Sequence, residues 1–283
     1  MKVFQKIGCF LIYSNLFIAA CSVLMAHQTF QFLLNSRSDF NLLAFIFFAT
    51  ICSYSFHWFL TSHSVIPSPR INWTTNNKVI HVILFLIGLA GAGFFFFMLI
   101  EYWFWLLIAS AITFLYSAPK IPHKYFRALR KVALGKTIFL SMVWMYVTTV
   151  LPIVVSNKEW NTSFTLFIIG RFFLIYAICI LFDLRDREDD KEAGIRSLIT
   201  YLSKRNIFIV FIFSLCIYLI VTIWLLYCGY ELKSIVVLLI PGIIVGLLYN
   251  YANKNFSDTL YYFVLDGLMA LSAMLMLIPG LSS

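Results

Sequence analysis

The chain has 283 residues, of which 62% are hydrophobic and only 12% are charged. A water-soluble domain of this length carries roughly twice that charged fraction, so the composition excludes a soluble globular protein and predicts an integral membrane protein. The formal charge of +9 does not indicate a nucleic-acid-binding protein, because the basic residues lie in short segments between apolar runs.

Apolar runs of the length that crosses a bilayer recur along the whole chain. They lie near residues 8–33, 40–60, 79–100, 102–118, 133–155, 164–182, 206–228, 233–250 and 258–279. We therefore predict an all-α polytopic membrane protein with about nine transmembrane helices, in which residues 1–283 form a single transmembrane domain. The first run is long, and we expect it to tilt or break near Ala26–Gln28.

The basic residues are distributed unevenly between the two ends of these runs. The N-terminal segment and the loops after the second, fourth, sixth and eighth runs hold every Lys and Arg except Arg37, Lys158, Arg171 and Lys233. Because cytoplasmic loops carry the excess of Lys and Arg, we expect the N-terminus inside and the C-terminus outside, in a bacterial cytoplasmic (inner) membrane. The larger cytoplasmic loops are then residues 61–78, 119–132 and 183–205.

The densest cluster of charge follows the sixth run, in the stretch DLRDREDDKEAGIRSL that spans residues 183–198. If the helix continues through this stretch, Asp183, Asp186 and Asp190 line one of its faces. Carboxylate oxygens suit Mg²⁺, which favours phosphate oxygens as its remaining ligands. A competing interpretation is a solvated loop whose carboxylates are neutralised by interleaved basic residues. Those basic residues are Arg185, Arg187, Lys191 and Arg196.

A second polar segment, YSAPKIP, follows the fourth run and places Tyr116 and Lys120 about one helical turn apart. Lys120 begins a basic stripe that continues to Lys136. Such a stripe binds anionic lipid headgroups, or its first lysine binds a diphosphate oxygen.

Both segments resemble motifs of the UbiA superfamily of membrane prenyltransferases. DLRDREDDKEAGIRSL is similar to the second aspartate-rich motif of that family, and YSAPKIP is similar to its YSxPP(x)K element, with Tyr116 and Lys120 in the YxxxK pattern. Asp183, Asp186 and Asp190 fill the aspartate positions of the motif, and Arg185 fills the basic position. Gly194 fills the glycine position, and Ser197-Leu198 stand in place of Thr-Leu.

The resemblance implies a UbiA-like helical bundle and a Mg²⁺-dependent transferase. Such an enzyme moves an isoprenyl group from a prenyl diphosphate to a lipophilic acceptor, of which an aromatic quinone precursor is one example. The resemblance implies that Asp186 and Asp190 are catalytic and that Asp183, Asp186 and Asp190 are the Mg²⁺ ligands. It also implies that the substrate is bound by Tyr116, Lys120, Arg185 and Lys191. Membrane lipid is the other expected partner, and no nucleic acid is expected.

The loop after the second run departs from the family pattern. The family carries a first aspartate motif there, but this chain has no Asp or Glu between Asp39 and Glu101. His57 and His63 lie in the corresponding region, either as donors to phosphate or, as we favour for His57, as a structural histidine. With one carboxylate cluster instead of two, the diphosphate leaving group has less charge neutralisation.

Three alternatives therefore remain beside an active prenyltransferase. The missing motif favours a non-catalytic UbiA-like protein that binds a polyprenyl or lipid diphosphate. A membrane transporter is disfavoured, because paired Gly- or Pro-broken spans are lacking in the two halves. A CDP-alcohol phosphotransferase would need a glycine where Arg187 stands.

Two charged residues, Arg171 and Asp266, fall inside apolar runs, where charges are costly and face the protein interior. They either pair with each other, or Arg171 extends to the outer interface. Gly88, Gly91 and Gly93 are expected to permit close packing of helices.

Overall fold

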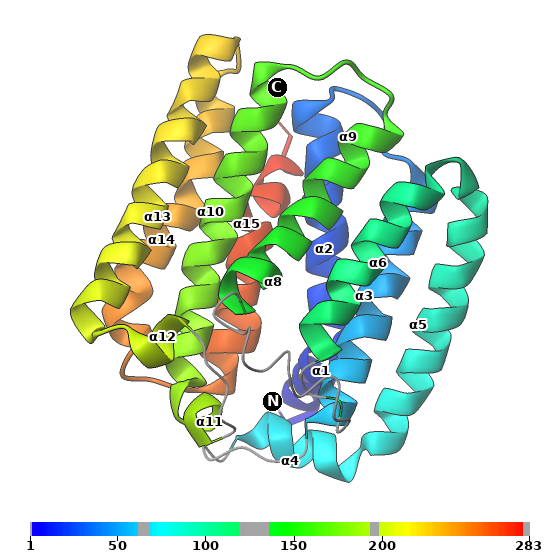
Figure 1. The fold of residues 1–283 in the computed structure, drawn as a ribbon, viewed down its shortest axis with the longest axis vertical. Coiled ribbons are helices and arrows are strands. Elements are labelled where there is room, and N and C mark those ends of the chain that lie inside the picture. Colours follow the sequence, from blue (N-terminus) through cyan, green and yellow to red (C-terminus); the bar gives the residue numbers. More distant parts are fainter. Residues whose placement is uncertain (1, 62–67, 119–120, 122–135, 193–197, 280–283) are drawn as a thin grey trace.

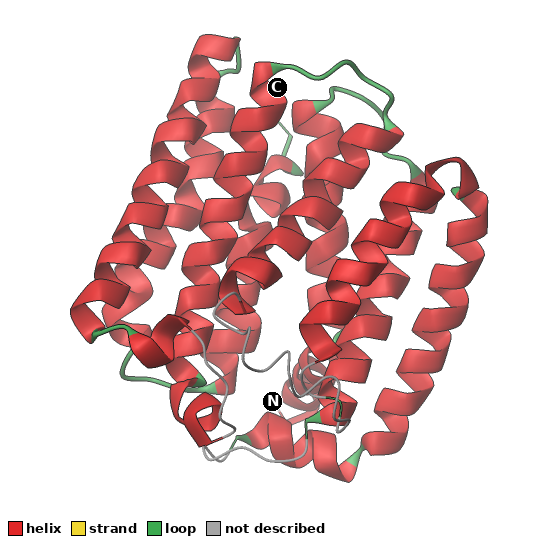
Figure 2. Cartoon of the chain, in the orientation of Figure 1, coloured by secondary structure: helices red, strands yellow, loops and turns green. Residues whose placement is uncertain are grey.

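The fold comes from a computed structural model that describes residues 2–61, 68–118, 121, 136–192 and 198–279. Every regular element within these residues is a helix, as Figure 2 shows. The prediction of an all-α membrane protein is therefore confirmed.

Among the residues that the structure describes, eight helical segments are long and apolar enough to cross a membrane, and the apolar segment Leu260–Met276 adds a shorter ninth. The first four are formed by α2 (Leu16–Gln28) with the π-helix η1 (Thr29–Leu33), α3 (Phe40–Leu60), α5 (Lys78–Met98), and η2 (Ile100–Tyr102) with α6 (Trp103–Ser117). The next two are α8 (Lys136–Met145) with the π-helix η5 (Tyr146–Val150) and α9 (Leu151–Val155), and α10 (Thr162–Arg185). The last three are α13 (Lys204–Trp224) with η6 (Leu225–Cys228), α14 (Leu232–Ala252), and the π-helix η7 (Leu260–Leu265) with α15 (Asp266–Met276).

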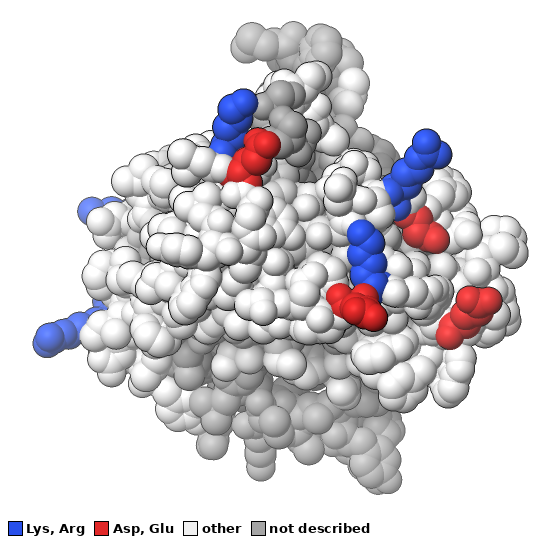
Figure 3. Space-filling view, turned by 90° about the horizontal axis from the view of Figure 1, so that it is seen from above, with Lys and Arg blue, Asp and Glu red and all other residues white. Residues whose placement is uncertain are grey.

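The remaining helices are short and lie together at one end of the bundle. They are α1 (Lys2–Tyr13), α4 (Pro69–Asn76), α11 (Arg187–Glu192) and α12 (Leu198–Tyr201). Figure 1 shows them at the bottom of the bundle, and we call this the motif end because the aspartate stretch begins there. Figure 3 shows the opposite end, where acidic and basic side chains are few and scattered among uncharged ones.

Helix α10, which leads into the aspartate stretch, is the most buried of the spanning helices. In its most apolar window 67% of the residues are buried, compared with 11% in α5 at the periphery. Figure 1 shows α10 between α13 and α14 on one side and α8 and α15 on the other. The polar stretch after α10 is therefore attached to the rigid centre of the bundle.

The first apolar run breaks at a different place from the one predicted. Helix α1 ends at Tyr13 and α2 begins at Leu16, with Asn15 between them in the left-handed region at φ 67°. Asparagine tolerates this conformation better than most side chains, so the kink forms there. The chain stays helical through Ala26–Gln28 and continues into η1, so the expected break at that point was wrong.

Two of the three glycines in α5 allow it to approach α3 closely. A Cβ atom at Gly88 would lie 2.6 Å from the main-chain nitrogen of Cys52, and one at Gly91 would lie 2.4 Å from the Phe48 ring. Nothing lies within 4 Å of the corresponding position at Gly93. The prediction of close packing is therefore confirmed for Gly88 and Gly91 and wrong for Gly93.

Arg171 is only 7% exposed and holds three spanning segments together. Its Nη1 donates to the main-chain oxygens of Met25 (2.8 Å) and Thr148 (3.1 Å), and its Nη2 donates to Gln28 Oε1 (2.6 Å). Met25 lies just before the π-turn η1, and Thr148 lies within η5. Because these neutral acceptors hold the guanidinium inside the bundle, Arg171 neither pairs with Asp266 nor extends to the interface, and both expectations were wrong.

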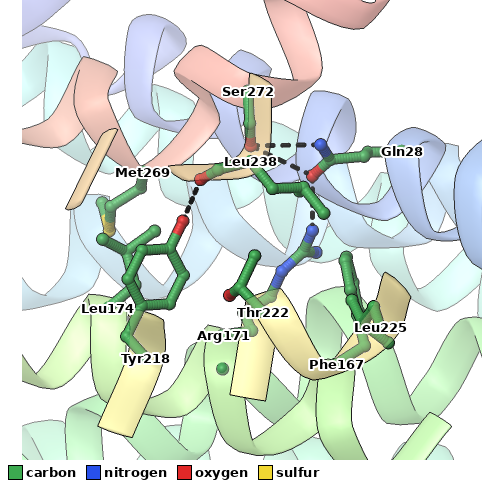
Figure 4. Close-up of a pocket in the computed structure, with 11 residues that line it drawn as sticks. Gln28, Phe167, Arg171, Leu174, Tyr218, Thr222, Leu225, Leu238, Met269 and Ser272 are labelled. Carbon is green, nitrogen blue, oxygen red and sulfur yellow. Dashed lines mark hydrogen bonds between the residues drawn. The ribbon is translucent and has the colours of Figure 1, made fainter. Parts of the chain in front are cut away.

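A cavity of about 20 Å³ lies beside Arg171 and is lined also by Tyr218, Thr222 and Ser272. Figure 4 shows Gln28 linking Arg171 to Ser272, and Tyr218 donating to the main-chain oxygen of Leu238. This volume suits about one water molecule and is far too small for an isoprenoid chain. The candidate site therefore lies elsewhere, at the motif end.

Candidate functional site

The aspartate stretch begins where α10 ends. Asp186 is the C-cap of α10 with φ −81° and ψ 2°, and α11 starts again at Arg187. The main-chain N–H of Asp190 donates to the Asp186 oxygen at 2.9 Å. The expected continuous helix is therefore interrupted at Asp186, and the three aspartates do not lie on the face of one unbroken helix.

The three aspartates lie at different depths. Asp183 and Asp190 are each 4% exposed, whereas Asp186 is half-buried. Thr137 in α8 donates its hydroxyl to Asp183 Oδ2, so this carboxylate is tied to the neighbouring spanning segment.

Arg185, the last residue of α10, forms a buried ion pair. Its Nη2 lies 2.7 Å from Asp258 Oδ1, and the two side chains are 5% and 6% exposed. The guanidinium carbon lies 4.7 Å from the ring centroid of Tyr262 and 4.9 Å from that of Tyr261. Asp258 stands at the start of the last helical segment, so this pair joins the aspartate stretch to that segment.

Asp258 also caps α4. It accepts the Arg70 main-chain N–H at 2.7 Å and the Ser68 hydroxyl at 2.7 and 2.8 Å. The first N–H groups of a helix have no partner within the helix, and negative charge is favoured at that end. Pro69 at the first position of α4 fixes where the helix begins. A carboxylate from the last segment thus orients the loop after α3.

The Arg70 side chain is held deep in the bundle at 3% exposure. Its Nη2 donates to Asn15 Oδ1 at 2.7 Å. Its guanidinium carbon lies 4.0 Å from the ring centroids of both Trp58 and Tyr262. The Tyr262 ring therefore contacts both Arg70 and Arg185, and we call Arg70, Arg185, Asp258 and Tyr262 the arginine cluster.

Two groups of this region lie outside the spanning segments and have shifted pKa values. Burial raises the pKa of Tyr13 to about 12, and the nearby Asp258 carboxylate adds to the shift. Tyr13 therefore stays protonated near neutral pH and donates to Asp258 Oδ2 at 3.4 Å. Burial lowers the pKa of Arg70, while the neighbouring Tyr262, Asp266 and Asp258 act in the opposite direction.

Tyr116 lies at the end of α6 and stacks on His57 at the end of α3. The ring centroids are 5.2 Å apart with an interplanar angle of 12°. The Ser117 hydroxyl lies 3.5 Å from His57 Nδ1. The tyrosine of the YSAPKIP segment therefore contacts the helix that precedes the missing first aspartate motif. Lys120 and His63 lie outside the described residues.

The family model for the UbiA prenyltransferase family matches residues 60–260 of the chain. The chain belongs to the UbiA prenyltransferase family. The matched region runs from the end of α3 to the first residue of η7 and contains both motifs identified from the sequence. The chain has no significant match among curated proteins or solved structures. Membership of the UbiA family implies, in general terms, a prenyl diphosphate and a lipophilic acceptor as substrates.

UbiA prenyltransferases generally use Mg²⁺, an ion that requires oxygen ligands such as carboxylates. Within them, no group of three or more His, Cys, Asp and Glu side chains is arranged to hold a metal ion. Mg²⁺ is commonly bound by one or two carboxylates together with substrate phosphates and water. Asp186 and Asp190, one turn apart, fit that arrangement, in which the diphosphate supplies further ligands.

Lys191, expected to bind substrate, lies on the outside of α11. Its Nζ donates to Glu188 Oε1 at 2.8 Å, and the two side chains are 45% and 61% exposed. The hydrogen bond from Lys191 lowers the pKa of Glu188. Exposed pairs of this kind contribute little to stability, so Lys191 remains available to an incoming anion.

Sequence reasoning did not identify Arg70, Asp258 or Asn15 as parts of the site. Asn15 lies within the first apolar run, Arg70 in the loop after the second, and Asp258 at the start of the last, all far from the aspartate stretch in the sequence. One signal was present, because Asp258 is the only acidic residue between Glu231 and Asp266 and lies directly before an apolar segment. In the folded chain Asp258 contacts Arg185, Arg70 shares Asp258 and the Tyr262 ring with it, and Asn15 bonds to Arg70.

Proposed function

We propose that this UbiA family protein transfers an isoprenyl group from a prenyl diphosphate to a lipophilic acceptor, with an aromatic quinone precursor as the acceptor class we favour. One observation carries the proposal. Asp186 follows the most buried helix of the bundle and interacts electrostatically with the buried Arg185, and Asp190 lies one helical turn further on. Carboxylates for Mg²⁺ beside guanidinium groups form a site suited to a diphosphate.

The residues take the following roles in this proposal. Asp186 and Asp190 hold the Mg²⁺, and Asp183 supports them from the end of α10. A bound Mg²⁺ neutralises the charge that develops on the leaving diphosphate. Arg185 donates to a diphosphate oxygen, Lys120 is assigned to the same anion from its motif alone, and Lys191 and Tyr116 bind the substrate as it enters from the cytoplasm.

The reaction needs no nucleophile from the protein. The allylic C–O bond of the donor breaks, and its electron pair leaves with the diphosphate. The acceptor then supplies the electron pair of the new bond and loses a proton. Negative charge develops on the leaving diphosphate as the bond breaks. Positive groups of the site stabilise this negative charge and so lower the barrier.

The test is prenyl transfer by the purified protein in uncharged detergent. We would incubate it with labelled geranylgeranyl diphosphate, Mg²⁺ and an aromatic acceptor, and measure diphosphate release and labelled product. Asp186→Asn is expected to lower the rate by at least about a hundred-fold, because one of the few hard ligands is lost. Glu188→Gln is the matched control, because Glu188 lies in the same stretch, is exposed and bonds only to Lys191 in the described residues.

The second candidate function is binding of a polyprenyl or lipid diphosphate without turnover. The absence of acidic residues between Asp39 and Glu101 favours it. Measurement of diphosphate release distinguishes the two functions. Saturable binding of the prenyl diphosphate with no diphosphate release, over a range of aromatic acceptors, would support the binding protein and reject the transferase.

A further inference from the structure

The two arginines of the arginine cluster each have a buried nitrogen that lacks a partner. Arg70 Nε and Arg185 Nη1 make no hydrogen bond within the described part of the chain. The two residues are 3% and 5% exposed. Buried polar groups are nearly always hydrogen-bonded, and a guanidinium N–H without an acceptor is costly. Such atoms on neighbouring residues indicate that the natural partner is a ligand.

Only one of the two guanidinium groups in the cluster forms an ion pair with a carboxylate among the described residues. Arg185 is paired with the Asp258 carboxylate, but the side chain of Arg70 donates to the neutral amide oxygen of Asn15. Arg70 reaches Asp258 only through its main-chain N–H. Asp266 lies within electrostatic range of both guanidinium groups, and no ion pair in the described residues reaches it. The Arg70 guanidinium therefore lacks an ion pair among the described residues, and a phosphate oxygen would supply one.

The cluster is rigid, which favours a built site over a flexible surface. The Tyr262 ring lies 4.0 Å from the Arg70 guanidinium and 4.7 Å from that of Arg185, and Trp58 covers Arg70 at 4.0 Å. Both arginines are also fixed by bonds to Asp258. Guanidinium groups held in this way present planar donors that match the oxygens of a phosphate.

The position of Arg70 is informative. It lies in the loop after α3, where the sequence lacks acidic residues, and α4 carries it toward Arg185. Asp186 of the aspartate stretch interacts electrostatically with Arg185. A diphosphate bound through Mg²⁺ at Asp186 would thus lie near an arginine pair, in a chain whose sequence has no acidic residue between Asp39 and Glu101.

We propose that Arg70 and Arg185 bind the diphosphate group directly and supply the charge that a second metal ion would otherwise provide. This inference rests on the proposed function only for the identity of the anion. It deepens that function by dividing the site into a carboxylate side, which needs Mg²⁺, and an arginine side, which does not. Part of the affinity for diphosphate is therefore independent of Mg²⁺.

The test is calorimetric titration of inorganic diphosphate into the purified full-length protein, in uncharged detergent with EDTA. Wild-type protein is expected to bind saturably without metal. Arg70→Gln is expected to weaken that binding on the order of ten- to a hundred-fold, the effect of one charge-assisted contact, and Arg70→Lys by less. Arg205→Gln is the matched control, since Arg205 is an exposed arginine at the start of α13 and its loss changes the net charge equally.

The outcomes separate this inference from the proposed function. If wild-type protein does not bind diphosphate in EDTA, the inference is overturned without any variant. An equal loss of diphosphate affinity in Arg70→Gln and Arg205→Gln also overturns it. Prenyl transfer with no metal-free binding would leave the proposed function standing and reject the arginine site. Metal-free diphosphate binding that depends on Arg70, together with no prenyl transfer, would support the arginine site and reject the proposed transferase.

Discussion

Arg185 Nη2 lies 2.7 Å from Asp258 Oδ1, and this buried ion pair connects the end of α10 to the start of the last helical segment. Asp258 accepts from the Arg70 main chain and from Ser68 at the same time. One carboxylate thus fixes the loop after α3, the aspartate stretch and the last segment relative to one another. The geometry of the motif end depends on this residue.

The first prediction concerns removal of that carboxylate. Asp258→Asn should lower the free energy of unfolding by about 3–5 kcal/mol, because it leaves the buried Arg185 charge without its partner. The measurement is thermal or denaturant unfolding of the purified protein in detergent. Glu188→Gln removes the exposed partner of Lys191 and is expected to leave the midpoint unchanged. Equal midpoints for wild-type protein and Asp258→Asn would contradict the structural role of the pair.

Some features of the motif end could be predicted from the sequence, and others could not. The stretch from Asp183 to Glu192 was identifiable because half of the acidic residues of the chain fall within it. The spanning helices were identifiable because apolar runs have few alternatives in a bilayer. Asp258 was not identifiable as a partner of Arg185, because a pair separated by 73 positions leaves no periodic pattern in the sequence.

Local geometry set a second limit. The break at Asn15 and the cap at Asp186 each depend on one residue's backbone conformation, and hydropathy is insensitive to both. Burial of Arg171 was expected, but its acceptors were not, because two of them are main-chain oxygens of Met25 and Thr148 and the third is the side chain of Gln28, 143 positions away in the sequence. Neither the main-chain acceptors nor the distant side-chain partner could be identified without the fold.

The second prediction uses the glycines of α5. Gly88→Ala should destabilise the protein by about 1–3 kcal/mol, since the added Cβ would lie 2.6 Å from the Cys52 nitrogen and would push α5 away from α3. Gly93→Ala should be neutral or stabilise by about 0.5–1 kcal/mol, because alanine favours the helix and open space surrounds that position. Unfolding midpoints of the two variants, measured side by side, check this. A larger loss in Gly93→Ala would reject the close contact of the two helices.

The third prediction concerns Arg171 in the core. Arg171→Ala should lower the free energy of unfolding by about 2–4 kcal/mol, because the Met25 and Thr148 oxygens and the Gln28 amide lose their shared donor. Arg37→Ala is the control, since Arg37 is an exposed arginine on a loop. Diphosphate binding by folded Arg171→Ala should equal that of wild type, as Arg171 lies about 18 Å from Asp183 along α10 at 1.5 Å per residue. A loss of binding without a loss of stability would instead assign Arg171 to the ligand site.

The last prediction tests the orientation of the bundle in the membrane. The N-terminal segment and the loops after the second, fourth, sixth and eighth apolar runs carry most of the basic residues in the sequence, so we expect the motif end to face the cytoplasm. Ser203 at the N-cap of α13 and Glu159 in the loop before α10 are both exposed, and they lie in the connections at opposite ends of the sixth spanning segment, α10. In intact bacterial cells, Ser203→Cys should resist a membrane-impermeant maleimide and Glu159→Cys should react with it. After permeabilisation both should react.

The parental chain, which keeps its six native cysteines, measures the background of this labelling. The orientation matters for function because a prenyl diphosphate carries several negative charges and reaches the site from the side on which it is made. A site at the cytoplasmic end takes donors made in the cytoplasm without moving the diphosphate through the bilayer. Labelling of Ser203→Cys in intact cells, with Glu159→Cys protected, would place the aspartate stretch and the arginine cluster outside. That result would reject a cytoplasmic diphosphate as the substrate.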